Sequence, residues 1–216
     1  MENWEQRTEE SHIDKSGWYD GPWMTEPDRI EWRNEHGQPC LIVRNQSGAL
    51  CGYVAVSPGH PLHGVQCDQE CEALKAQLEQ RMNEPLGNAP GLMLMIGALT
   101  GSVGARPDCA INVHGGLTYS DACQAGGKIC HVPREGEPET VWWFGFDCAH
   151  CNDYSRMDSK RFEGTENASF MCEPPNRWNS TTTYRSVNYV RGEVERLAEQ
   201  LRAIEAAPPS PAQGAL

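Results

Sequence analysis

Residues 141–146, with the sequence Val-Trp-Trp-Phe-Gly-Phe, constrain the fold of this chain more than any other stretch. An apolar and aromatic run of this kind is typical of a strand buried in a sheet. Because successive side chains of a strand point to opposite faces, the aromatic residues are expected on both faces. Some of them should be core residues. The others, Trp143 among them, could line a pocket that stacks a base or sugar ring, with core packing as the alternative.

Two β-rich runs earlier in the chain predict a hairpin. Residues 39–44 and 49–56 are separated by Asn-Gln-Ser-Gly, a sequence that favours a tight turn. Residues 109–114 predict a further short strand, which ends in a sharp turn at Gly115 and Gly116. Residues 121–139 carry the pair Gly126-Gly127 and two prolines and are expected to be a loop.

The spacing of apolar residues predicts two helices. Within residues 68–83, leucine and methionine recur every four positions. Residues 184–206 form the longest predicted helix, because valine and leucine make one apolar stripe along them. We expect this helix to pack on a small, mainly antiparallel sheet, which makes the fold class α+β.

The length of 216 residues suits one domain with a sizeable core, which we expect over residues 21–206. Residues 1–20 predict a flexible amino-terminal arm, and the Pro-rich residues 207–216 predict a disordered tail. Residues 67–108 are interpreted as an insertion. Its Gly- and Met/Leu-rich second half could be a lid, a partner-binding loop or a segment packed on the core. Residues 154–183 predict a long surface excursion.

The formal net charge is −12, with 18 basic and 30 acidic residues. This charge disfavours binding to duplex nucleic acid or to an anionic membrane, both of which attract basic surfaces. The first residues lack the basic start and apolar core of a secretory signal. The most apolar segment, residues 92–99, is much shorter than the ~20 residues that span a bilayer. We therefore expect a cytoplasmic protein with no membrane span.

The chain has ten cysteines. Without an export signal, free thiols or metal ligands are expected rather than disulfides. The sequence Cys148-Ala-His-Cys151 suggests a structural zinc site, which would need two more ligands. The candidate partners are Cys67 and Cys71, or Cys123, Cys130 and His131. Neither set has the spacing of a zinc finger or ribbon.

Asp147, His150 and Asp153 follow the aromatic strand at three-residue spacing, so two or three of them could face one ion. Oxygen and imidazole ligands suit Zn²⁺, Mn²⁺ or Fe²⁺, which activate water at neutral pH. The alternative is that Asp147 caps a turn and His150 is a loop histidine with ordinary hydrogen-bond partners.

His114 precedes two glycines whose backbone amides could bind an oxyanion or a phosphate. The neighbouring hydroxyl groups could donate to an anionic ligand or could be turn residues. The ligand-binding candidates in this stretch are Gly115, Gly116, Thr118 and Tyr119.

His60 and His63 lie in a Pro- and Gly-rich loop that follows the predicted hairpin. If this loop met the other two polar stretches at one sheet edge, the side chains would form a metal or acid–base site. The predicted catalytic residues are then His60, His114, Asp147 and His150, and the predicted metal ligands are His63, Asp147, His150 and Asp153.

Five sequence strings carry a resemblance to a known family. They are Cys51-Gly-Tyr-Val, Gly59-His-Pro-Leu-His-Gly, Val113-His-Gly-Gly-Leu-Thr, Trp142-Trp-Phe-Gly-Phe-Asp-Cys-Ala-His with Asp153, and Tyr189-Val-Arg with Glu193. Over about residues 38–201 the chain resembles an uncharacterised family of small bacteriophage and bacterial proteins. The resemblance implies a phage origin and no established activity. The insertion is longer than the family pattern.

The favoured functional hypothesis is a small metal-dependent hydrolase that acts on a phosphoester or nucleotide-like molecule, because many polar groups collect at the predicted strand ends. The alternative is a phage anti-defence protein without catalytic activity, which sequesters a small nucleotide signal or blocks a host protein in the host cytoplasm. A third hypothesis is a structural or partner-binding protein that uses the Met/Leu-rich insertion.

Overall fold

The computed structural model describes residues 7–18, 20–83, 97, 103–123, 129–150, 152–154 and 183–206. In this part of the chain the strands form one sheet of six strands in the order β1-β2-β3-β4-β6-β5, and every neighbouring pair is antiparallel. The strands are β1 (Arg7–Glu10), β2 (Arg29–Arg33), β3 (Pro39–Arg44), β4 (Leu50–Val56), β5 (Tyr119–Ala122) and β6 (Trp142–Asp147).

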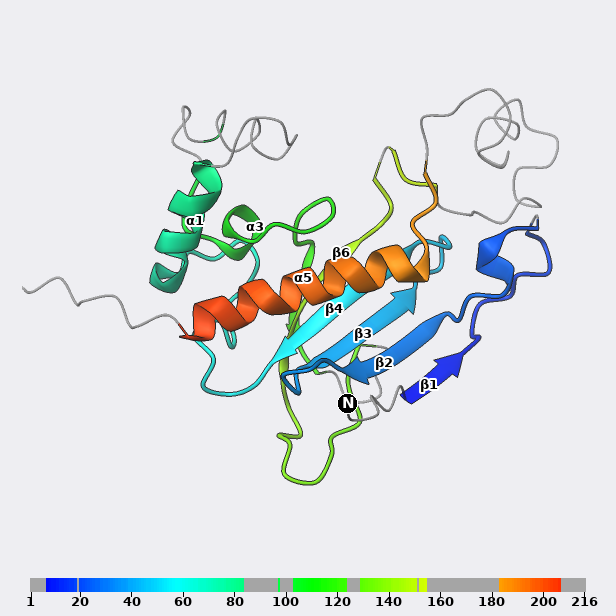
Figure 1. Ribbon diagram of the computed structural model, residues 1–216, viewed down its shortest axis with the longest axis horizontal. Coiled ribbons are helices and arrows are strands. Elements are labelled where there is room, and N and C mark those ends of the chain that lie inside the picture. Colours follow the sequence, from blue (N-terminus) through cyan, green and yellow to red (C-terminus); the bar gives the residue numbers. More distant parts are fainter. Residues whose placement is uncertain are drawn as a thin grey trace, which may run out of the picture.

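A long carboxy-terminal helix lies across one face of this sheet, and two short helices, residues 75–82 and 107–110, lie toward the carboxy-terminal end of that helix (Figure 1). The helical segments are η1 (Pro22–Met24), η2 (Glu72–Leu74), α1 (Lys75–Met82), α3 (Pro107–Ala110) and α5 (Val187–Ala206). The expected α+β class, with an antiparallel sheet packed by the last helix, is therefore confirmed. No helix in the described ranges has the length and apolar character needed to cross a membrane.

The β3–β4 hairpin forms because Asn45 organises its turn. The Asn45 side-chain oxygen accepts hydrogen bonds from the amides of Ser47 and Ala49, each at 3.0 Å. Gly48 adopts a φ of 86°, in the left-handed region that glycine enters without strain. This turn confirms the hairpin predicted from the sequence.

The sheet has an apolar core on both faces. The apolar stripe of α5 packs on Trp142, Phe144 and Phe146 of β6 and on alternate residues of β2, β3 and β4. Trp143 points to the opposite face, where its side chain is 0% exposed. The suggestion that Trp143 lines a ligand pocket is therefore wrong, because a fully enclosed indole offers no surface to a ligand.

Three strands, β1, β2 and β5, were not predicted from the sequence. Residues 7–10 pair with β2 as an edge strand, although they belong to the expected flexible arm. The sequence of β2 is Arg-Ile-Glu-Trp-Arg, for which no strand was predicted. β5 is short and polar, and its last two residues lie in the expected loop. Conversely, residues 109–114 form no strand, because Cys109 and Ala110 end α3 and the following residues are coil.

The expected absence of disulfides is wrong at one position, because Cys123 is bonded to Cys130. Six other cysteines are free thiols: Cys40, Cys51, Cys67, Cys71, Cys109 and Cys148. Cys151 and Cys172 lie outside the described residues, as do residues 207–216, nearly all of the predicted surface excursion and most of the second half of the insertion. The predictions for those segments stay predictions.

Candidate functional site

His114, His150 and Asp153 lie together beside the amino-terminal half of α5. The His114 Nε2 atom is 2.7 Å from Asp153 Oδ2, and the His150 Nδ1 atom is 3.3 Å from the same oxygen. One nitrogen of each imidazole and one carboxylate oxygen all lie within 4.8 Å of one another. This group could hold a metal ion.

The chain following β6 delivers two of these three residues. The Asp153 amide donates to the His150 carbonyl at 2.9 Å, which closes a turn. Asp153 and Thr183 form an isolated parallel bridge, and the Tyr154 amide donates to the Thr183 carbonyl at 2.9 Å. The turn is thus tied to the residues just before α5, which brings Arg185 next to Asp153.

Asp153 is the most enclosed member of the group, with a side chain that is 1% exposed. Arg185 Nε donates to its Oδ1 atom at 2.7 Å, and the His150 amide donates to its Oδ2 atom at 3.0 Å. Burial raises the pKa of Asp153, but the hydrogen bonds from Arg185, His114 and the His150 amide outweigh burial, so the pKa lies below its ordinary value. Asp153 is therefore a carboxylate at neutral pH.

His114 is held at its other ring nitrogen and at its backbone. Its Nδ1 atom is 2.9 Å from the Tyr189 hydroxyl oxygen, and its amide donates to Glu193 Oε2 at 2.9 Å. Burial raises the pKa of Tyr189, so the phenol keeps its proton. The proton arrangement that fits this geometry has Tyr189 donating to Nδ1 and Nε2–H donating to Asp153, because Nε2 and a carboxylate oxygen 2.7 Å apart cannot both be acceptors. Metal binding at Nε2 would need the other tautomer, in which Nδ1–H donates to Tyr189 and the ion takes the place of the Nε2 hydrogen.

Gly115 lets the two imidazoles approach each other. Its φ is 67°, and a Cβ atom at this position would lie 1.9 Å from His150 Cε1. No side chain can therefore replace the glycine while His150 keeps its place. The ring centroids of His114 and His150 are 5.3 Å apart across this glycine.

Asp147 does not join the group. It lies on the face of β6 that Trp143 occupies, away from α5, because strand side chains alternate. Its two oxygens accept hydrogen bonds from the Thr118 hydroxyl and the Ala149 amide, each at 3.0 Å. Asp147 thus caps the turn after the strand, which was the alternative to metal binding.

His60 and His63 are also elsewhere. His60 is buried, with Nε2 2.9 Å from the Leu201 carbonyl oxygen and Nδ1 accepting from the Leu62 amide at 3.0 Å. Burial lowers its pKa, so it is a neutral residue that fastens its loop to α5. His63 is exposed and lies near Trp142, at the beginning of β6.

The predicted convergence at one sheet edge fails because β4 and β6 are antiparallel. Val56, at the end of β4, pairs with Trp142, and Cys51, at its beginning, pairs with Asp147. The loop after β4 and the loop after β6 therefore leave the sheet at opposite ends of the strands. Leu201 is twelve residues beyond Tyr189 on α5, which corresponds to roughly 18 Å of helix.

Most of the ligand-binding candidates that follow His114 in the sequence also lie apart from the metal-ligand group. Gly115 and Gly116 form the sharp turn that was expected, with φ values of 67° and 93°. Thr118 donates to Asp147, and Tyr119 packs edge-on against Tyr53, with centroids 5.3 Å apart. Of these four residues, only Gly115 touches the metal-ligand group.

Sequence reasoning missed Arg185, Tyr189 and Glu193 as parts of the site. Their four-residue spacing would have placed them on one face of a helix, and this signal was available. Glu193 is 8% exposed, although it lies outside the apolar stripe that predicted the helix.

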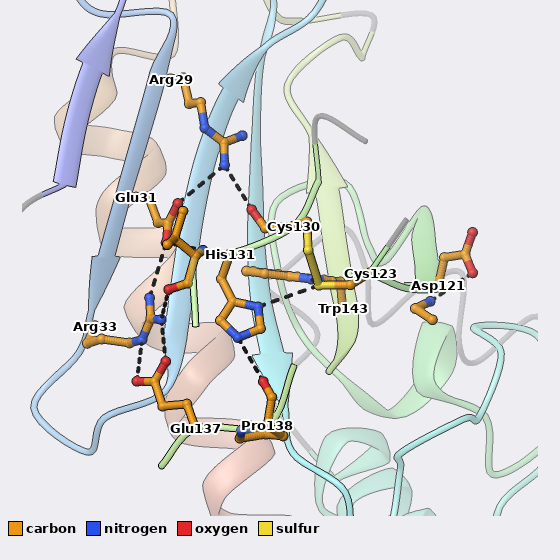
Figure 2. Close-up of a disulfide and its surroundings, with 12 residues drawn as sticks. Arg29, Glu31, Arg33, Asp121, Cys123, Cys130, His131, Glu137, Pro138 and Trp143 are labelled. Atoms are coloured by element: carbon orange, nitrogen blue, oxygen red, sulfur yellow. Dashed lines mark hydrogen bonds and ion pairs between the residues drawn. A yellow bond between two sulfur atoms is a disulfide. The ribbon is translucent and has the colours of Figure 1, made fainter. Parts of the chain in front are cut away.

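A second group that could hold a metal ion consists of Cys123, Cys130 and His131. It lies on the other face of the sheet (Figure 2).

Comparison of the chain with protein-family models, with curated proteins and with solved structures gives no match.

Proposed function

We propose that this chain is a metal-dependent hydrolase of phosphoesters or nucleotide-like small molecules, with His114, His150 and Asp153 as the metal ligands. The observation that carries the proposal is the approach of two imidazole nitrogens to one buried carboxylate oxygen. Two histidines and one carboxylate are a common donor set for Zn²⁺, Mn²⁺ and Fe²⁺. Such an ion supplies a Lewis acid that activates water at neutral pH.

The surroundings of the three residues support the proposal. Metal-binding histidines usually have a partner at the second ring nitrogen, and Tyr189 is in that position for His114. Metal-binding carboxylates are usually hydrogen-bonded themselves, and Arg185 does this for Asp153. Both partners come from α5 or from the residues just before it, so docking of the helix orients the donor set.

An anionic substrate is favoured by the charge beside the group. Arg185 is partly exposed and lies 4.8 Å from the ring centroid of Tyr189. Hydrogen bonding to Asp153 raises its pKa despite burial, so the guanidinium is always positive. In a chain with a net charge of −12, a cation at this place favours a phosphate group over a neutral ligand.

His150→Ala tests the proposal with the least disturbance, because the imidazole is 35% exposed. We expect this variant to lose stoichiometric binding of Zn²⁺ or Mn²⁺ in calorimetric titration and to lose turnover of a phosphoester and nucleotide panel. Asp147→Asn is the matched control, since Asp147 is the last residue of the strand that leads to His150 but lies outside the group. Its metal binding should equal that of the wild type. Equal metal binding by the His150→Ala variant, or an absence of metal binding by the wild type, would contradict the proposal.

A second candidate function is binding without catalysis, as in a phage anti-defence protein that sequesters a small nucleotide signal or blocks a host protein. It is favoured by the completeness of the hydrogen bonding, because both oxygens of Asp153 already have donors. Nucleotides incubated with the protein and released by heating would then be recovered intact. Mass spectrometry of the released compounds separates the two functions, since a hydrolase would yield cleaved products.

A further inference from the structure

Cys123, Cys130 and His131 form a compact group on the face of the sheet opposite α5. Cys123 and Cys130 are bonded to each other, and His131 Nδ1 lies 3.5 Å from Cys123 Sγ. Figure 2 shows the imidazole between the cysteine sulfur on one side and the Pro138 carbonyl on the other. The two sulfur atoms and one ring nitrogen lie within 4.8 Å of one another.

The proton position on His131 follows from its two partners. Its Nε2 atom is 3.2 Å from the Pro138 carbonyl oxygen, which can only accept, so Nε2 carries the hydrogen. The lone pair of Nδ1 then points toward the sulfur. The ring is also buried, with 5% of its surface exposed. An imidazole that donates one N–H to a backbone carbonyl and presents the other nitrogen is the usual state of a metal-binding histidine.

The oxidised sulfur gives this lone pair no hydrogen to accept, because a disulfide carries none. A second donor also faces the sulfur, since Trp143 Nε1 donates to Cys123 Sγ at 3.2 Å. Hydrogen bonds to sulfur favour a negatively charged thiolate over a neutral thiol. In the reduced protein, a metal ion between Cys123 Sγ and His131 Nδ1 would meet the nitrogen lone pair and, once the thiol proton has left, the charge on the sulfur.

Cys123 and Cys130 are also held by hydrogen bonds that do not involve their sulfur atoms. The Cys123 amide donates to the Val141 carbonyl at 3.1 Å, which fixes it next to the beginning of β6. Arg29 on β2 donates to the Cys130 carbonyl at 2.8 Å (Figure 2). Both ligand-bearing segments remain tied to the sheet when the sulfur–sulfur bond is broken, so the donor atoms stay close together.

We propose that the reduced protein binds one Zn²⁺ ion through Cys123 Sγ, Cys130 Sγ and His131 Nδ1, and that metal and disulfide exclude each other. A thiol reductant converts the disulfide into two thiols and is itself oxidised to a disulfide. Zn²⁺ then replaces the two thiol protons, which are released to water, while His131 releases none. Three protein ligands leave the fourth tetrahedral position of the ion for water or a small ligand.

Titration with Co²⁺ in place of Zn²⁺ tests the proposal in the full-length protein, because only bound cysteine sulfur gives intense thiolate-to-metal charge-transfer absorption. We expect this band to saturate at one equivalent in the reduced wild type and to be absent in the oxidised wild type and in the reduced Cys130→Ser variant. Cys67→Ser is the matched control, since Cys67 is a free thiol outside the group, and it should retain the band. The signal is independent of the site around His114, whose ligands are nitrogen and oxygen.

A second measurement needs no substitution. Reduced wild-type protein is alkylated with iodoacetamide with and without Zn²⁺, and the modification of each cysteine is read by peptide mass spectrometry. Zn²⁺ should slow the alkylation of Cys123 and Cys130 at least tenfold relative to Cys67. Equal alkylation with and without Zn²⁺, or a cobalt band that persists in the Cys130→Ser variant, would overturn the proposal.

Discussion

At the scale of single residues, the candidate metal site depends on backbone conformation as much as on the ligands. Gly115 and Gly116 both have positive φ, so any other residue at either position is strained by about 1–3 kcal/mol. The two positions differ in space. A Cβ atom at Gly115 would collide with the His150 ring, whereas nothing lies within 4 Å of such an atom at Gly116.

This difference predicts separate effects of two alanine substitutions. Gly115→Ala should weaken metal binding strongly because the His150 imidazole has to swing away from His114 and Asp153. Gly116→Ala should lower the free energy of unfolding by the backbone strain of about 1–3 kcal/mol. It should leave metal affinity within a few-fold of the wild type. Calorimetric titration and urea denaturation of both variants check this. A similar loss of metal affinity in both would mean that strain, not contact with His150, controls the site.

The same scale shows what the sequence could reveal about the site. His114, His150 and Asp153 were all candidates, because each follows an apolar run. Asp147 was a candidate for the same reason. The sequence left metal binding and turn capping open for Asp147, and the side chain caps the turn, accepting from Thr118 and Ala149.

At the scale of elements, the close packing of α5 on β4 depends on a missing side chain. Gly52 faces the helix, and a Cβ atom there would lie 2.5 Å from Phe146 Cζ and 2.6 Å from Val194 Cγ2. Both neighbours are buried in the core, so neither can move freely. Gly192 lies on the exposed side of the same helix, with nothing within 4 Å of its Cβ position.

Substitution of these two glycines by alanine should have opposite effects. Gly52→Ala overfills the core and is expected to lower the free energy of unfolding by about 1–3 kcal/mol. Gly192→Ala is expected to raise it by about 0.5–1 kcal/mol, because glycine is a poor residue in the interior of a helix. Urea denaturation at neutral pH measures both. A neutral or stabilising Gly52→Ala would show that the helix can shift away from β4.

Elements with a strong apolar pattern were predictable, and those stabilised by polar contacts were not. The two hairpin strands and β6 are continuous apolar runs, and α5 carries one apolar stripe. β2 carries charged residues on the face opposite α5, and they are buried by the segment that contains Glu137. Arg33 donates to both oxygens of Glu137, at 2.9 and 2.6 Å, and burial of such a partner cannot be anticipated from the strand sequence alone.

At the scale of the whole molecule, the amino-terminal segment is fastened to the sheet by a buried carboxylate. Asp28 and Arg44 both have fully enclosed side chains, and Arg44 Nε donates to Asp28 Oδ1 at 2.8 Å. Lys15 Nζ lies 2.7 Å from the same oxygen. Burial raises the pKa of Asp28, but Lys15, the Ile13 amide and Arg44 outweigh burial and hold the pKa below the ordinary value of 3.8.

This lowered pKa predicts a loss of stability in acid. The unfolded chain takes up a proton at Asp28 before the folded protein does, so the contribution of Asp28 is complete above about pH 5 and is lost as the pH falls through the folded pKa. Asp28→Asn should cost about 3–5 kcal/mol at pH 7, because Arg44 keeps a buried charge without its carboxylate. Urea denaturation at several pH values should show that the difference in free energy of unfolding between the wild type and the Asp28→Asn variant becomes smaller below pH 4. A difference that does not change with pH would contradict the prediction.

The arrangement of the whole sheet was the least predictable feature. The expected meeting of His60 with His114 assumed that loops after different strands leave at one edge. Loops that follow neighbouring parallel strands do leave at the same end of the sheet. β4 and β6 are antiparallel, so the loops that follow them leave at opposite ends of the strands. The strand sequences contain no information on which neighbour each strand chooses across the insertion.

The position of α5 late in the chain also has a consequence for synthesis. The face of β3 and β4 that α5 covers is made long before residues 187–206 leave the ribosome, and β6 itself follows β4 only after the insertion. Until the helix docks, a nascent chain carries an uncovered apolar sheet face and an unpaired strand edge. The interval between translation of β4 and arrival of α5 is therefore when neighbouring nascent chains can aggregate most easily.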